Sequence, residues 1–68
     1  MGDLYNICQA VLRQVEQEHP EPMDLLRVKG ELARSAGFMV SLVGPGDPDD
    51  PSKIASVRDA ARGLGIDV

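Results

Sequence analysis

The sequence predicts an all-α fold, a small three-helix bundle with a long central helix that is completed by self-association. Apolar residues recur every three or four positions in three segments, which is the spacing of one face of an α-helix. Stretches rich in proline or glycine separate these segments. A chain of 68 residues buries only about 60% of the surface that it exposes when unfolded. We therefore expect one domain, residues 1–68, with a thin core completed by a second chain.

The first helix is predicted over residues 3–18. Its apolar residues fall at i, i+3, i+4, i+7, i+8 and i+11, and they are Leu4, Ile7, Cys8, Val11, Leu12 and Val15. Asp3 is the expected N-cap, because its carboxylate can accept from the free N–H groups of the first turn. Cys8 lies within the apolar stripe and is expected to be a buried, unreactive thiol. The helix should end at His19, because Pro20 disfavours helical geometry in the residue before it.

The second helix is predicted over residues 23–43, with Asp24 as its N-cap, and it is expected to be the longest element. Its apolar stripe follows steps of three, four or seven and consists of Leu25, Val28, Leu32, Met39 and Leu42. A second row contains only small residues, which would let another helix approach this one closely. These helix-packing residues are Gly30, Ala33 and Gly37.

The last two turns of this predicted helix are apolar on all sides, with only Ser41 polar after Gly37. Such a helix end must be covered by something. The expected interaction surface is therefore Phe38, Met39, Val40, Leu42 and Val43. An alternative is that Gly37 ends the helix and residues 38–43 form a short buried strand, whose backbone would have to pair with another molecule. Both alternatives predict association through the same residues.

The third helix is predicted over residues 51–63, after a loop with three prolines and two glycines in eight residues. Asp50 is the expected N-cap and Pro51 the first helical residue. A glycine at position 63 or 65 should end the helix in a left-handed conformation. Beyond it, Ile66 and Val68 are available to fold back onto the bundle.

Charge and composition argue against several classes of function. A net charge of −4 disfavours binding to a nucleic-acid backbone. The sequence has no basic, apolar leader and no apolar stretch of about 20 residues, so we expect a cytoplasmic protein without a membrane partner. One histidine and one cysteine cannot form a four-ligand zinc site. Cys8 and His19 are about 16 Å apart along one helix, too far to act together in catalysis.

The densest group of oxygen ligands is Asp47, Asp49 and Asp50, in the loop before the third helix. It lacks the spacing of an EF-hand, because Arg58 stands where the closing glutamate should be. We therefore expect turn and capping roles for these carboxylates and no cofactor. The favoured function is a non-enzymatic protein–protein interaction module, a homo-oligomer or a small adaptor. The alternative is a regulatory protein that binds a metal or small ligand in the Gly44–Asp50 loop.

Overall fold

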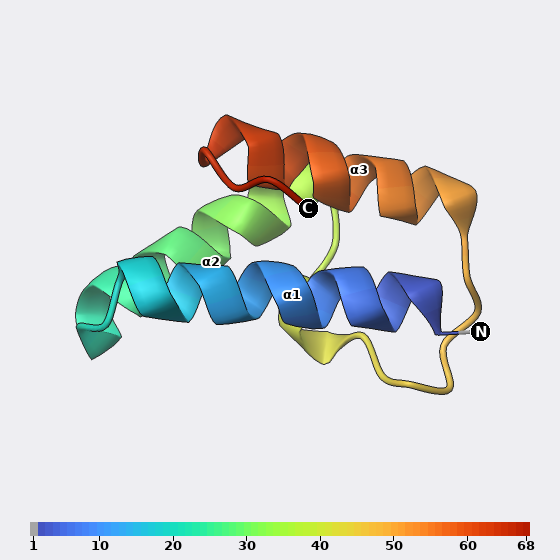
Figure 1. Ribbon diagram of the computed structural model, residues 1–68, viewed down its shortest axis with the longest axis horizontal. Coiled ribbons are helices and arrows are strands. Elements are labelled where there is room, and N and C mark those ends of the chain that lie inside the picture. Colours follow the sequence, from blue (N-terminus) through green and yellow to red (C-terminus); the bar gives the residue numbers. More distant parts are fainter. Residues whose placement is uncertain (1) are drawn as a thin grey trace.

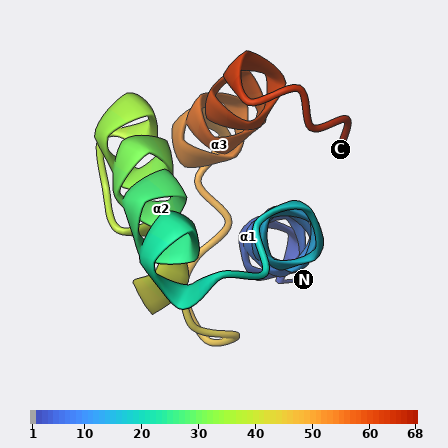
Figure 2. The same cartoon turned by 90° about the vertical axis from the view of Figure 1, so that its left-hand side faces the viewer.

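The computed structural model describes residues 2–68, and within that range it contains helices and no strand. The elements in chain order are α1 (Asp3–Glu18), α2 (Pro22–Ala36), a short 3-10 helix η1 (Val40–Leu42) and α3 (Pro51–Gly63) (Figure 1). Each of the three α-helices packs against the other two. Viewed along α1, they stand at the corners of a triangle (Figure 2). The predicted all-α fold with three helices is confirmed.

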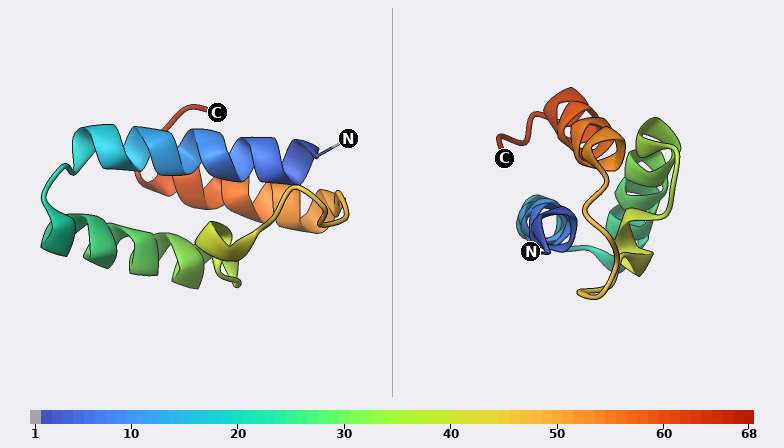
Figure 3. Two further views of the ribbon diagram at one scale, coloured as in Figure 1. Left: turned by 90° about the horizontal axis from the view of Figure 1, so that it is seen from below. Right: turned by 90° about the vertical axis from the view of Figure 1, so that its right-hand side faces the viewer.

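The N-cap residue of α1 is not the expected one. The helix covers the predicted residues, but Asp3 is its first residue and Gly2 occupies the N-cap position with φ +75°, without a side-chain cap. The acceptor comes from the loop before α3, where the carboxylate of Asp49 accepts from the backbone N–H groups of Gly2 and Leu4, each at 3.1 Å. The loop is thereby attached to the start of the chain, and its backbone passes below the first turn of α1 in the left-hand view of Figure 3.

Helix α2 begins one residue earlier than predicted, and its N-cap is Glu21 rather than Asp24. Proline is favoured at the first helical position, because its ring fixes a helical φ and it has no N–H group to leave unpaired, so Pro22 starts the helix. Asp24 lies in the first turn. Its carboxylate accepts from Arg27 and contacts the His19 ring at 2.6 Å, which links the start of α2 to the residue that follows α1.

The prediction of one long helix over residues 23–43 is wrong, because α2 ends at Ala36. Gly37 adopts φ +84°, and its N–H donates to the carbonyl of Ala33 at 2.9 Å. Glycine reaches this left-handed region at little cost because it has no Cβ. The chain then turns so that Val40 enters the core, 2% exposed. With 15 residues, α2 is shorter than the 16-residue α1.

The alternative prediction of a strand over residues 38–43 is also wrong, although its helix stop at Gly37 is confirmed. The segment instead forms the 3-10 turn η1, in which Leu42 donates to the carbonyl of Met39 at 3.1 Å and Val43 to that of Val40 at 3.4 Å. These local bonds satisfy backbone groups that a lone strand would leave without partners.

Helix α3 agrees with its prediction at both ends. The side chain of Asp50 accepts from the backbone N–H of Ser52 at 2.9 Å, and Pro51 is the first helical residue. At the end of the helix, Gly65 (φ +77°) donates to the carbonyl of Arg62 and Ile66 to that of Ala61, which together form a Schellman motif. This motif returns Ile66 to the core. Val68 remains 41% exposed and lies outside the core, beside Arg58 and Arg62 of α3.

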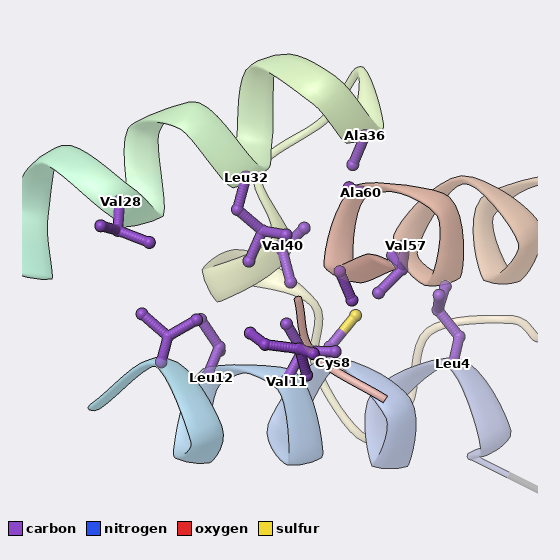
Figure 4. Close-up of a cluster of buried hydrophobic side chains, with 13 residues drawn as sticks. Leu4, Cys8, Val11, Leu12, Val28, Leu32, Ala36, Val40, Val57 and Ala60 are labelled. Atoms are coloured by element: carbon purple, nitrogen blue, oxygen red, sulfur yellow. The ribbon is translucent and has the colours of Figure 1, made fainter. Parts of the chain in front are cut away.

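The core lies between the three helices and receives one side chain from η1 and one from the C-terminal segment (Figure 4). It contains mainly valine, leucine and alanine, with the Cys8 thiol among them. Its members are Leu4, Cys8, Val11, Leu12, Val15, Val28, Leu32, Ala36, Val40, Val57, Ala60, Ala61 and Ile66.

Candidate functional site

The five residues predicted as an interaction surface do not form one exposed patch. Val40 is a core residue, and Phe38 and Val43 are partly buried against the core. The Phe38 ring is also covered by Lys53, whose Nζ lies 5.4 Å from the ring centroid. Only Met39 (54% exposed) and Leu42 (75% exposed) remain accessible. The folded chain therefore covers most of the surface for which a second chain was expected.

A larger apolar surface lies on α2 itself, on the side away from the core. The inner face of the helix carries Val28, Leu32 and Ala36, which point toward α1 and α3 (Figure 4). Because α1 and α3 both lie on that side, neither helix covers the opposite side of α2 (Figure 2). We call this opposite side the outer face, and it consists of Met23, Leu26, Gly30, Ala33 and Gly37.

The outer face combines large and small residues at the spacing of a helix–helix seam. Its five positions are separated by steps of three, four, three and four, the repeat that places side chains along one side of a helix. Met23 is 85% exposed and Leu26 is 74% exposed, which makes them two of the most exposed large apolar residues in the described chain. In the first half of the face, the side chains of Met23 and Leu26 extend into solvent. The second half consists of Gly30, Ala33 and Gly37, which have little or no side chain.

The second half of the outer face forms a shallow, open hollow. It is lined by the small residues Gly30, Ala33 and Gly37 and by the larger residues Arg34, Phe38 and Met39. A Cβ added at Gly30 or Gly37 would meet no heavy atom of another element within 4 Å. The row of small residues predicted to receive a helix therefore receives none from the described residues, 2–68.

Charged side chains follow one edge of the outer face. Arg27 is held by Asp24 at 2.5 Å and by Glu31 at 3.7 Å. The hydrogen bond from Arg27, together with that of His19, lowers the pKa of Asp24 below its ordinary value. Two other exposed charges near this face, Glu21 and Arg34, take part in none of the ion pairs found within residues 2–68.

The side chains that could take part in chemistry are the Cys8 thiol and the loop carboxylates, and these are buried or hydrogen-bonded to the backbone. Cys8 is fully buried, and this burial raises the pKa of its thiol. The carboxylates of the Gly44–Asp50 loop all accept from backbone N–H groups: Asp47 from Gly44 at 2.9 Å, Asp49 from the start of α1, and Asp50 from α3. Residues 2–68 contain no group of three histidine, cysteine, aspartate or glutamate side chains arranged to hold a metal ion.

Sequence reasoning identified the small residues of the outer face but missed Met23 and Leu26. Neither residue lies on the stripe that contains Val28 and Leu32. The signal was present in the sequence as a second repeat of threes and fours, shifted from the first. Recognising it required knowledge of where α2 ends and which side faces the core.

In the described part of the chain, no helix has the length and apolar character needed to cross a membrane. Comparisons with protein-family models, with curated proteins and with solved structures found no match to this chain.

Proposed function

We propose that this protein is a non-enzymatic interaction module that self-associates through the outer face of α2. The observation that carries the proposal is the placement of Met23 and Leu26, 85% and 74% exposed, in line with an open hollow on the same face. Large exposed apolar side chains beside a concave apolar surface are typical of interaction sites.

The size of the outer face indicates a weak, reversible complex. Helix α2 has 15 residues and is therefore about 22 Å long. Two such helices bury less than the roughly 1,200 Å² that separates stable interfaces from transient ones. Burying Leu26 at its present exposure should contribute about 1–2 kcal/mol per copy, and Met23 a similar amount. These contributions favour a dimer that forms and dissociates with concentration, rather than an obligate one.

The proposed surface differs in position from the one predicted by the sequence. Met39 remains part of it, as one side of the hollow, whereas Leu42 does not line the hollow. Leu26 and Leu42 are almost equally exposed, at 74% and 75%. The same substitution at these two positions therefore separates association through the outer face from association through residues 38–43.

The test is the solution mass, measured by sedimentation equilibrium from about 1 µM to about 1 mM protein. The wild type should rise with concentration from 7.3 kDa toward twice that mass. Leu26→Asp should remain near 7.3 kDa, because each dimer would bury two aspartates in an apolar seam. Leu42→Asp should behave like the wild type, and circular dichroism should show that both variants keep their helices.

Two results would contradict the proposal. A wild type that stays monomeric over the whole range would remove self-association. A dimer that is lost in Leu42→Asp and kept in Leu26→Asp would move the interface to residues 38–43.

A further inference from the structure

We infer that the two copies pair with their α2 helices antiparallel, so that Met23 of each copy inserts into the hollow of the other. This inference rests on the proposed self-association and adds the orientation and register of the two chains. Three features support it: the shape of the hollow, the uneven distribution of large and small residues along the outer face, and two charges beside that face that form no ion pair within residues 2–68.

The hollow has the geometry of a coiled-coil hole. Four of its lining residues, Gly30, Ala33, Arg34 and Gly37, stand at i, i+3, i+4 and i+7 on one helix. In knobs-into-holes packing, a set of four neighbouring residues on one helix surrounds one side chain of the facing helix. Two glycines and an alanine leave this hole wide enough for a long side chain. Methionine is unbranched and flexible, which suits it to fill a space of irregular outline.

The order of residues along the outer face selects the antiparallel orientation. Its large residues, Met23 and Leu26, come first, and its small residues, Ala33 and Gly37, come last. A parallel pair would place large side chains against large ones at one end and would leave a gap between small ones at the other. An antiparallel pair places large against small at both ends. With Met23 opposite Ala33 of the second copy, Leu26 lies opposite Gly30.

The charges beside the face favour the same arrangement. In the register just given, Arg34 lies opposite residue 22 of the second copy and is adjacent to its Glu21. Both side chains are exposed, and neither takes part in an ion pair found within residues 2–68. The two-fold symmetry of the pair produces this contact twice. In a parallel pair, Arg34 would approach Arg34 and Glu21 would approach Glu21, which is repulsive.

Charge reversal tests the orientation. Arg34→Glu and Glu21→Arg should each weaken the dimer by about 2- to 30-fold, the effect of losing two exposed ion pairs. The double variant Arg34→Glu/Glu21→Arg should return to within a few-fold of the wild-type dissociation constant, because the pairs are restored with their signs exchanged. All constants are measured by sedimentation equilibrium at low salt, where exposed charges are least screened.

The matched control is Arg13→Glu, an exposed position on α1. Like Arg34→Glu, it changes the net charge from −4 to −6, so it reports any general effect of charge on association. Arg13→Glu should leave the dissociation constant close to that of the wild type. Thermal melting of each variant shows whether the fold is kept, since Glu21 stands at the start of α2.

The outcomes distinguish this inference from the function on which it rests. A monomeric wild type would overturn both the antiparallel pairing and the proposed self-association. The outer face would then be a candidate binding site for a different protein. A wild-type dimer that Arg34→Gln strengthens would indicate parallel helices, because neutralising Arg34 would remove the Arg34–Arg34 repulsion of that arrangement. A dimer that both single variants weaken and the double variant does not restore would overturn the Arg34–Glu21 contact, with self-association still standing.

Discussion

The contact between Asp49 and the start of α1 should contribute a large share of the stability of this protein. Asp49 is exposed, yet its carboxylate accepts from the N–H groups of Gly2 and Leu4 across more than 40 residues of sequence. Replacing Asp49 by alanine leaves these donors without the acceptor that now serves them. It also releases the loop that connects η1 to α3 from the start of α1. The expected result is a lower melting temperature without loss of the native fold.

The magnitude follows from the two interactions that the carboxylate makes. Losing a side-chain acceptor at a helix N-terminus costs about 1 kcal/mol, and losing the negative charge there costs roughly 0.3–1 kcal/mol more. The total of about 1.3–2 kcal/mol is a substantial part of the roughly 3–10 kcal/mol expected for a domain of this size. For a domain of this length it corresponds to a decrease in melting temperature of about 5–16 °C.

The assay is thermal unfolding followed by circular dichroism, in the Leu26→Asp background so that association does not add to stability. Asp47→Ala is the matched control, because it removes the same charge from the same loop, and Asp47 accepts only from Gly44 three residues away. Asp49→Asn keeps one acceptor oxygen and should fall between the two. A melting temperature for Asp49→Ala within about 2 °C of that for Asp47→Ala would refute the capping role.

Two further predictions concern the fold around α2. Val40→Ala should lower the free energy of unfolding by about 2 kcal/mol, because buried apolar surface is lost and a cavity is left behind. Leu42→Ala should change the free energy of unfolding by less than about 0.5 kcal/mol, because Leu42 is exposed. Both values are measured by urea unfolding, and equal effects would contradict the burial of Val40. Asp24 has a pKa lowered from 3.8, chiefly by its hydrogen bond from Arg27, so its contribution is present above pH 3.8 and is lost as the pH falls through the lower folded-state pKa. The difference in melting temperature between wild type and Asp24→Asn should therefore be full at pH 7 and shrink below pH 3.8, and a constant difference would argue against this linkage.

The parts of the fold that could be predicted are those fixed by neighbouring residues. Asp50 and Pro51 start α3 because the cap, the first helical residue and the recipient N–H of Ser52 all lie within three positions. Pro20 ends α1 for an equally local reason. The cap of α1 could not be predicted, because its acceptor, Asp49, is 45 residues away from Leu4 in the sequence. A sequence pattern read in short windows contains no information about such a contact.

The end of α2 shows a different limit. Apolar residues continue on both sides of Gly37, so their periodicity fits a helix that continues as well as one that stops. The choice depends on whether Val40 gains more from burial between the helices than the chain loses by ending its hydrogen-bond pattern. That comparison involves α1 and α3 as well as α2. The helix ends at Gly37 because glycine adopts the left-handed conformation at little cost. The burial of Val40 stabilises the turn that follows.

The stop at Gly37 also determines which surface is left for another molecule. Had the helix continued to residue 43, its last turns would have carried the exposed apolar residues, as the sequence suggested. Because the chain turns back, Val40 enters the core and Phe38 and Met39 form a wall beside Gly30, Ala33 and Gly37. The same break that completes the core within one chain creates the hollow on its outer side. The self-association that we propose therefore uses the first half of α2, where Met23 and Leu26 are exposed, together with the hollow at the end of the helix. In an antiparallel pair, the large side chains of one copy would fill the hollow of the other.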